Sequence, residues 1–320
     1  MNLEAPVRVD SAFRADVLAE FRMTRRAIPA RWFYDRAGSE LFERITALPE
    51  YYPTRVETEL LARHASEVAK IIGPGRAVVE FGSGSSTKTP HVLEAVQPAA
   101  YVPIDISGDF LRESAAALAS DFPKLSILPV EADFMHPIVP PKAIANLPKL
   151  GFFPGSTIGN MVARTGVNLL RVMVETLGIG SMLLIGMDRI KDVDTLTRAY
   201  DDAEGVTAAF NLNLLRRINR ELDADVPVDA FRHRAIWNDG YARVEMHLEA
   251  VADVAFTIAG ERFAMRAGET IHTENSHKYG PRDARLLLRA GAWTPIAEWT
   301  DAEDQFALIL CEAQPAGTAP

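Results

Sequence analysis

The sequence contains very little cysteine and no long apolar segment. Cys311 is the one cysteine among 320 residues, which excludes an intramolecular disulfide and a zinc cluster built from several cysteines. No stretch approaches the roughly 20 apolar residues of a membrane helix. Residues 1–13 carry acids and a proline where a signal peptide has its apolar core. We therefore expect a cytoplasmic protein without a membrane partner.

Basic residues are also too few for a general nucleic-acid-binding protein. The chain has 34 Lys and Arg against 43 Asp and Glu, a net charge of −9. Such a chain repels phosphate backbones and anionic lipid, so we expect no nucleic-acid partner. The hydrophobic share of 48% and the charged share of 24% are typical of a folded globular protein.

Short β-branched segments alternate with helical patterns over the middle of the chain. This alternation predicts βαβ units and a doubly wound, parallel α/β sheet of the Rossmann-like type. The expected strands cover residues 77–81, 101–104, 126–130, 150–153 and 181–187, and the expected helices cover 88–96, 109–120 and 166–177.

The pattern changes after Lys191. A long helical stretch, 194–222, precedes segments that alternate as antiparallel strands do, and the chain then returns to helix, strand and strand. We infer a parallel-sheet domain that is interrupted by an insertion, with the N-terminal segment joining the inserted α+β part. The expected domains are 57–192 with 281–320, and 1–56 with 193–280.

A glycine-rich turn, 82–89, follows the first strand and opens a helix. Such a turn lets a ligand approach backbone N–H groups. A dinucleotide site requires a third glycine where Thr87 stands, and the P-loop pattern fails at the same residue. A site for S-adenosylmethionine requires only small residues there, since this cofactor has no pyrophosphate.

Acidic residues end the next two strands. Asp105 is placed to accept both ribose hydroxyls of a nucleoside, which excludes the P-loop interpretation but is also expected in an NAD enzyme. Together with the missing glycine, it favours S-adenosylmethionine. Asp133 and Phe134 suit the adenine amine and ring, although a strand-end cap and a core phenylalanine have the same pattern.

The segment 154–160 follows the fourth strand, at the edge where ligands of open α/β sheets bind. Methylation of an amine requires acceptors that hold the nitrogen in line with the S–CH3 bond, and the Gly155 backbone and the Asn160 side chain can supply them. DNA amino-methyltransferases carry an Asp/Asn-Pro-Pro-aromatic motif at this place. Its absence argues against a nucleic-acid substrate.

These motifs together resemble the S-adenosylmethionine-dependent histidine Nα-methyltransferases of ergothioneine biosynthesis, which convert L-histidine to the trimethylated betaine hercynine. The resemblance covers about residues 31–311. It rests on Leu-Pro-Glu-Tyr-Tyr-Pro-Thr-Arg (48–55), Gly-Ser-Gly-Ser-Ser-Thr-Lys-Thr (82–89), Pro-Gly-Ser-Thr-Ile-Gly-Asn (154–160), Tyr-Asp-Asp…Phe-Asn-Leu-Asn (200–213) and His-Thr-Glu-Asn-Ser-His-Lys-Tyr (272–279).

The resemblance implies a role for each matching residue. The cofactor contacts are Gly82, Lys88, Asp105, Asp133 and Phe134. The remaining matches concern the substrate: Asn160 and Tyr200 for its carboxylate, Tyr34 and Gly155 near its amine, Tyr51 (rather than Tyr52), Glu274 and Ser276 for its imidazole, and Met246 and Phe210 for the pocket lining.

The chemistry fits these roles. An ammonium has no lone pair, so the amine must lose a proton before each of three methyl transfers, and we expect release through Tyr34 and water. The activation barrier is lowered chiefly by holding the amine nitrogen and the methyl donor in line. The methylated ammonium is best held by aromatic faces, which Tyr34, Tyr51 and Phe210 can supply. Glu274 and Ser276 can satisfy the donor and the acceptor of an imidazole.

Three other functions stay open from the residues alone. They are methylation of another aromatic amino acid such as tryptophan, a catalytically inert module that binds the cofactor, and an NAD oxidoreductase. His272 and His277 suggest a metal, but no third ligand is evident, so we expect none. We expect a monomer that acts on a small molecule.

The expected role of Glu274 in recognising the substrate imidazole gives a testable prediction. Replacing Glu274→Ala leaves the imidazole without its carboxylate partner, so kcat/KM for histidine should fall by about 10–100-fold. Alone or combined with Met246→Val, it should admit a larger aromatic amino acid. Steady-state kinetics with histidine and tryptophan measure both effects, and unchanged histidine kinetics in Glu274→Ala would refute the role.

Overall fold

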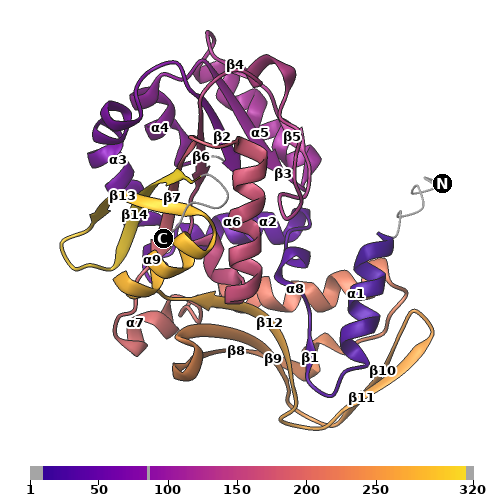
Figure 1. Cartoon of the computed structure of the whole chain (residues 1–320). Helices are drawn as coiled ribbons and strands as arrows, with labels where there is room; N and C mark the ends of the chain where they lie inside the picture. Colours follow the sequence, from indigo (N-terminus) through magenta and orange to yellow (C-terminus); the bar gives the residue numbers. More distant parts are fainter. Residues whose placement is uncertain (1–9, 85–86, 315–320) are drawn as a thin grey trace. The chain divides into compact units, whose positions relative to one another are not determined.

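The computed structural model describes residues 10–84 and 87–314 (Figure 1). Within these residues, no helix combines the length and the apolar character that crossing a membrane requires.

The described chain forms two compact units. Unit 1 comprises the described residues up to Tyr51 together with Asp192–Ser276, and unit 2 comprises Tyr52–Lys191 and the described residues from His277 onward. The chain thus changes unit after residues 51, 191 and 276, somewhat before the positions 56, 192 and 280 expected from the sequence.

Unit 2 is built around an eight-stranded sheet with the order β13-β14-β7-β6-β2-β3-β4, in which β5 also pairs with β3. The pairs among β2 to β7 are parallel, while β14 is antiparallel to β7 and to β13. The expected parallel α/β sheet is therefore confirmed. Its strands are β2 (Ala77–Phe81), β3 (Ala100–Asp105), β4 (Ser126–Ile127), β5 (Val130–Glu131), β6 (Lys149–Phe153), β7 (Met182–Asp188), β13 (Trp293–Thr300) and β14 (Phe306–Ala313).

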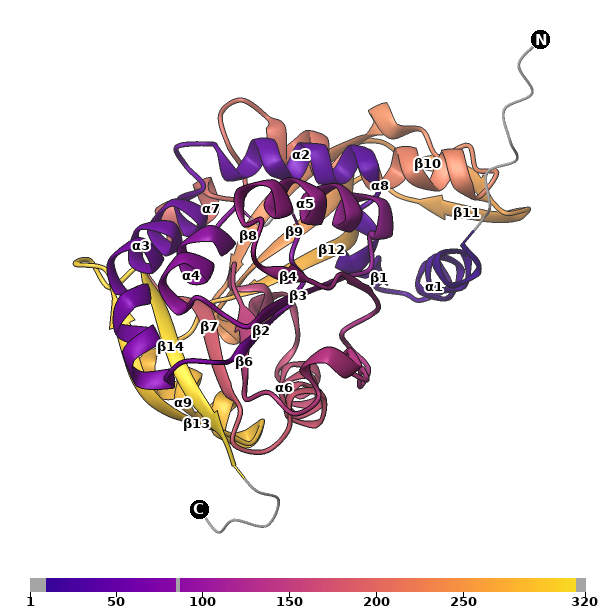
Figure 2. The ribbon, with the colours of Figure 1, turned by 90° about the horizontal axis from the view of Figure 1, so that it is seen from above.

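Helices cover both faces of this sheet, as a doubly wound fold requires. Figure 2 shows α3, α4 and α5 on one face and α6 and α9 on the other. Leu169 and Met173 of α6 and Leu288 of α9 share one hydrophobic cluster with the strands beneath them. The helices are α3 (Tyr52–Ile72), α4 (Thr89–Val96), α5 (Gly108–Asp121), α6 (Ala163–Leu177) and α9 (Pro281–Ala290).

Strand β14 lies inside the sheet although it comes last in the sequence. It pairs with β13 on one side and β7 on the other, and Phe306 to Cys311 are all fully buried. A strand that is covered on both faces needs an unbroken apolar run rather than an alternating one. The sequence Phe-Ala-Leu-Ile-Leu-Cys provides that run.

One expected strand of unit 2 is interrupted. Residues 126–130 were expected to form a single strand, but β4 ends at Ile127 and β5 begins at Val130. Pro129 lies in the interruption, where it has no N–H to donate to the neighbouring strand. Leu128 still donates to the carbonyl of Tyr101 at 2.8 Å, so the segment follows β3 without a continuous ladder.

Unit 1 combines a four-stranded sheet, in the order β1-β12-β9-β8, with a separate hairpin formed by β10 and β11. Its strands are β1 (Arg26–Ala27), β8 (Phe231–Asn238), β9 (Arg243–Ala250), β10 (Val254–Ile258), β11 (Glu261–Met265) and β12 (Thr270–His277). Its helices are α1 (Ser11–Phe21), α2 (Arg36–Thr46), α7 (Val193–Arg198) and α8 (Val206–Glu221).

The expected long helix at 194–222 is wrong, because two helices, α7 and α8, occupy this stretch. The break contains Gly205, whose φ of 71° lies in the left-handed region that favours glycine. Asp202 then starts α8, since its carboxylate accepts the N–H groups of Val206 at 2.9 Å and Thr207 at 2.7 Å. A side chain that satisfies the first N–H groups of a helix fixes where that helix begins.

Close packing at the end of α9 generates a prediction for stability. A Cβ added at Gly291 would lie 2.3 Å from the Cβ of Leu170, which cannot move without the helix α6. We expect Gly291→Ala to lower the free energy of unfolding by about 1–3 kcal/mol in urea denaturation. The matched control is Gly166→Ala in α6, where the nearest atom is 3.4 Å away. Equal unfolding midpoints for the two variants would contradict this account.

Candidate functional site

The glycine turn of unit 2 is fixed between the ends of β2 and β3. Gly82 and Gly84 have φ values of 72° and 50°, in the left-handed region. The N–H of Gly82 donates to the carbonyl of Ile104 at 2.8 Å, and that of Gly84 to the carboxylate of Asp105 at 3.1 Å. Ser85 and Ser86 of the same motif lie outside the described residues. The turn therefore keeps its backbone at the carboxyl edge of the sheet, where a ligand can approach it.

Asp105 is held by backbone donors on both sides. One carboxylate oxygen accepts from Gly84 and the other from Ser107, at 2.9 Å. A carboxylate has about four acceptor positions, so two such bonds fix its orientation and leave acceptor capacity for ribose hydroxyls.

Asp133 and Phe134 follow β5, and Phe134 lies beside the turn. A Cβ at Gly82 would be 3.3 Å from the Phe134 ring, which also packs edge-on to Phe153 with 5.9 Å between ring centroids. Asp133 accepts the N–H of Met135 at 2.9 Å. The structure thus brings the predicted residues Gly82, Asp105 and Phe134 to one edge, and glycine at 82 leaves room for the aromatic ring.

Lys88 has a buried partner that the sequence analysis missed. Its ammonium forms an ion pair with Glu57 of α3, a side chain that is fully buried. The same carboxylate accepts the N–H of Gly155 at 2.8 and 3.0 Å. Glu57 therefore links Lys88 to the predicted loop at Gly155. Its position inside a helical apolar pattern gave no signal of this role.

The loop that carries Asn160 is anchored at both ends. It closes with a 3₁₀ turn (Thr157–Asn160), and the carbonyl of Gly159 bonds to Nδ1 of His277 at 2.8 Å. At its start, Ser156 has a φ of 53° and its hydroxyl accepts the N–H of Asp188 at 2.9 Å. Asn160 is half-buried at the end of this fixed turn.

A second buried carboxylate, Asp188 at the end of β7, has several donors. The hydroxyl of Tyr52 donates to it at 2.7 Å, Lys191 at 2.6 Å and Lys278 at 2.7 Å. Burial opposes the charge, but the two lysines outweigh burial and lower the pKa of Asp188. Tyr52 is thus committed to this cluster in unit 2, whereas Tyr51 belongs to unit 1.

The predicted aromatic residues of unit 1 lie in one cluster. Phe210 of α8 stacks on Phe33 at 4.3 Å and lies 6.0 Å from Tyr34. Phe42 of α2 contacts Tyr34, Phe210 and Tyr51, at 5.7, 6.0 and 6.3 Å. Phe42 is a further residue that the sequence analysis missed, because it fits the apolar face of its helix.

Two predicted substrate residues of unit 1 are hydrogen-bonded to each other. The hydroxyl of Tyr200 lies 2.6 Å from that of Ser276 on β12, and the ring of Tyr200 lies 6.0 Å from that of Tyr51. Met246 is buried on the neighbouring strand β9, where its carbonyl accepts the hydroxyl of Thr273 at 3.0 Å. Glu274 is half-buried on β12, two residues before Ser276.

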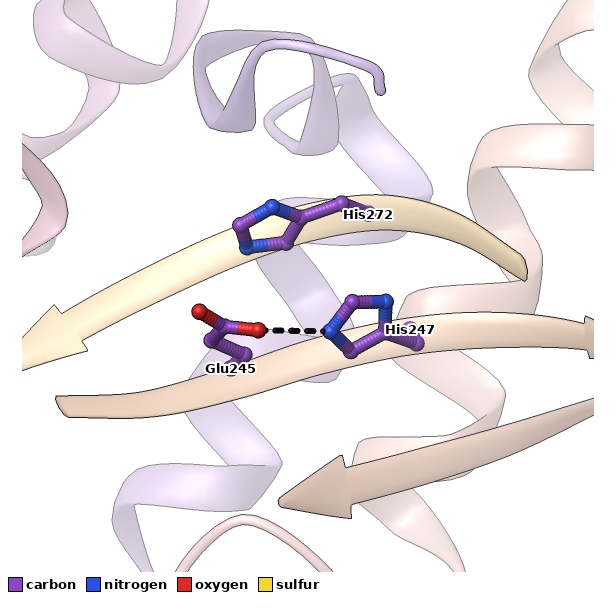
Figure 3. Close-up of side chains that lie close together, drawn as sticks. All are labelled: Glu245, His247 and His272. Carbon is purple, nitrogen blue, oxygen red and sulfur yellow. Dashed lines mark hydrogen bonds and ion pairs between the residues drawn. The ribbon is translucent and has the colours of Figure 1, made fainter. Parts of the chain in front are cut away.

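The two histidines considered as metal ligands both lie on β12, five residues apart. Among the described residues His277 is not part of a group of three possible ligands, and its Nδ1 bonds to the carbonyl of Gly159 at 2.8 Å. His272 instead lies near Glu245 and His247 of β9, and among the described residues these three form a group whose ligand atoms are within 4.8 Å of one another (Figure 3).

The buried acid before the glycine turn generates a pH prediction. Burial raises the pKa of Glu80 to about 7 from 4.5, although Tyr101 and Thr89 donate to its carboxylate. Between pH 4.5 and about pH 7 the folded chain keeps this proton, whereas the unfolded chain releases it. The free energy of unfolding of the wild type therefore falls as the pH rises through this range. Glu80→Gln has no carboxyl group at this position, so its free energy of unfolding does not fall in this way.

We therefore expect the stability of Glu80→Gln relative to wild type to rise by about 3 kcal/mol between roughly pH 5 and pH 8. Urea denaturation at the two pH values measures it, with the exposed Glu113→Gln as control. A relative stability of Glu80→Gln that is independent of pH would contradict the raised pKa.

Comparison with known proteins covers nearly the whole chain. The model of the family described as histidine-specific, SAM-dependent methyltransferases matches residues 13–313. Histidine N-alpha-methyltransferase of Mycolicibacterium smegmatis is 38% identical, over 93% of this chain and 94% of that protein. Ergothioneine biosynthesis protein 1 of Neurospora crassa is 28% identical over 92% of this chain and 34% of its own length. The 4-dimethylallyltryptophan N-methyltransferase easF of Claviceps fusiformis is 24% identical over 92% and 90%. The chain belongs to the family of histidine-specific methyltransferases that use S-adenosylmethionine.

Proposed function

We propose that this protein transfers three methyl groups from S-adenosylmethionine to the α-amino group of free L-histidine, giving hercynine, the first step of ergothioneine biosynthesis. The observation that carries the proposal is the histidine-specific family match over residues 13–313, because it spans both units. The higher identity to a histidine methyltransferase, 38% against 24% for the dimethylallyltryptophan enzyme, favours histidine over a larger aromatic substrate.

The residues at the carboxyl edge of the unit 2 sheet suit the cofactor. Asp105, oriented by two backbone N–H groups, would accept the ribose hydroxyls. Asp133 would accept the adenine amine, with Phe134 against the ring. The turn at Gly82 and the ion-paired Lys88 would lie along the methionine part of the cofactor.

Each methyl transfer requires a free amine lone pair and a correct line of attack. The amine lone pair forms the new N–C bond while the S–C bond breaks. The electron pair of the S–C bond stays on sulfur, and S-adenosylhomocysteine leaves. We assign Asn160 and Tyr200 to the substrate carboxylate, and Tyr34 and the Gly155 backbone to the amine. Holding the nitrogen and the methyl carbon in line supplies most of the rate increase.

Three transfers release three protons, and the product is a quaternary ammonium without N–H groups. The proton released each time would pass through Tyr34 and water. Later in the series, hydrogen bonds to the nitrogen are lost while its charge persists, so aromatic faces become the better partners. Tyr34, Phe210 and Tyr51, which Phe42 joins into one cluster, supply such faces.

We assign recognition of the imidazole to Tyr51, Glu274 and Ser276, with Met246 lining the pocket. The bond between the Ser276 and Tyr200 hydroxyls restricts how the serine can turn. A site with polar groups in fixed directions rejects side chains that leave those groups unpaired. This arrangement supports a preference for histidine over an apolar amino acid.

The acidic composition and the single cysteine support a cytoplasmic enzyme that acts on small molecules, without nucleic-acid or membrane partners. We propose that the chain acts as a monomer.

The first experiment is mass spectrometry of the purified protein with S-adenosylmethionine and each of the twenty amino acids. We expect a gain of three methyl groups on histidine alone. Methylation of tryptophan or tyrosine instead would refute the assigned roles of Glu274 and Ser276. No methylation of any amino acid would favour a catalytically inert module that binds the cofactor.

Tyr200→Phe tests the site within the same assay. The variant keeps the ring and loses the hydroxyl, so we expect kcat/KM for histidine to fall by about 10–100-fold, as for the loss of a hydrogen bond to a charged group. The control is Tyr241→Phe, because Tyr241 is exposed on the same unit. Equal kinetics for the two variants would remove Tyr200 from the site.

A further inference from the structure

Three side chains on adjacent strands of unit 1 are arranged as a set of metal ligands. Glu245 and His247 lie on β9 and His272 on β12, and Figure 3 shows them turned toward one another. Their ligand atoms all lie within 4.8 Å of one another. We propose that Glu245, His247 and His272 bind a divalent transition-metal ion, with Zn²⁺ as the representative.

The donor types select this class of ion. Two imidazole nitrogens and one carboxylate oxygen, with a water as fourth ligand, form a common tetrahedral zinc site. Calcium and magnesium prefer sites built from oxygen atoms alone. In the part of the chain that the structure describes, no other set of three His, Cys, Asp or Glu side chains comes this close together.

Neighbouring groups already orient Glu245. One oxygen of its carboxylate accepts from Asn238 at 2.9 Å and from Arg243 at 2.7 Å, and the other faces Nε2 of His247 at 3.0 Å. Carboxylates that bind metals are usually held in this way by hydrogen bonds from a second layer of residues. The side chain of Glu245 is only 8% exposed, so its direction is fixed.

The two imidazoles are packed rather than fully hydrogen-bonded. Their rings stack with centroids 4.7 Å apart and planes 16° apart. Nε2 of His272 bonds to the carbonyl of Glu274 at 3.0 Å, but Nδ1 of His247 is buried without a hydrogen-bond partner. Buried ring nitrogens normally have a hydrogen-bond partner. Hydrogen bonds within the sheet therefore do not fully explain why both rings are buried at this place.

Binding requires a small closure of the side chains. Zinc–ligand bonds of about 2.0–2.2 Å place tetrahedral ligand atoms roughly 3.4 Å apart, less than the present limit of 4.8 Å. Rotation of the two imidazoles toward the fixed carboxylate of Glu245 can supply this movement, since β9 and β12 are already neighbours. The charge of Arg243 opposes the cation, so we expect weaker binding than in a cysteine-rich zinc site.

Metal binding to the full-length, untagged protein tests the proposal directly. After treatment with a chelator, the protein is titrated with Zn²⁺ in competition with a chromophoric chelator. We expect about one ion per chain, and at least a tenfold loss of affinity in His247→Gln and in His272→Gln. The matched control is His136→Gln, since His136 also lies beside a carboxylate, Asp133, but has no second imidazole there.

Co²⁺ gives a second readout that does not depend on a variant folding. Bound by this set in wild type, it should show the strong visible absorption of a four-coordinate ion, which excess Zn²⁺ abolishes. No Zn²⁺ binding, absorption typical of six-coordinate Co²⁺ only, or undiminished affinity in both folded variants would overturn the proposal. Neither measurement depends on methyl transfer, so the outcome is separate from that of the proposed function.

Discussion

The fold of unit 2 depends most on the ion pairs and hydrogen bonds around the buried carboxylate of Asp188. It ends β7, its backbone N–H donates to Ser156, and its side chain accepts from Tyr52, Lys191 and Lys278. A buried charge of this kind is tolerated only with its partners in place, since removing one side of the pair leaves the other uncompensated. Tyr52 is the first and Lys191 the last residue of one segment of unit 2, and Lys278 is the second residue of the other segment. Each change of the chain from one unit to the other therefore occurs next to a residue of this cluster.

The charges near the proposed cofactor site suit the chemistry of S-adenosylmethionine. S-adenosylmethionine is a cation at its sulfur, and an unpaired lysine nearby would repel it. Lys88 is instead paired with Glu57, which is fully buried and also accepts the N–H of Gly155. The pair contributes hydrogen-bonding geometry without net charge, and the loop at Gly155 is fixed by the same carboxylate.

Much of the fold could be predicted from the sequence, because alternation of apolar strands and helices is a local signal. The parallel sheet, the glycine turn and the acid at the end of β3 all follow from it. The breaks at Pro129 and Gly205 were missed, although proline and glycine at those positions were the available signals. Glu57 and Phe42 could not be identified, because a helical pattern does not show which side chain reaches a distant loop. Tyr200 and Ser276 are far apart in sequence, and only the folded unit 1 brings their hydroxyls to 2.6 Å. Glu245 and His247 flank Met246 on β9, but the sequence does not show that His272, on β12, lies beside them.

The order of strands has a consequence for how the chain is made. In unit 1, Arg26 of β1 pairs with Ile271 of β12, and in unit 2, β14 inserts between β7 and β13. A ribosome must therefore synthesise β12 before the first sheet can close, and Ala313 before the second can. Contacts between residues so distant along the chain are the slowest to form. The first sheet can therefore be completed only after His277 has been synthesised, and the second only after Ala313.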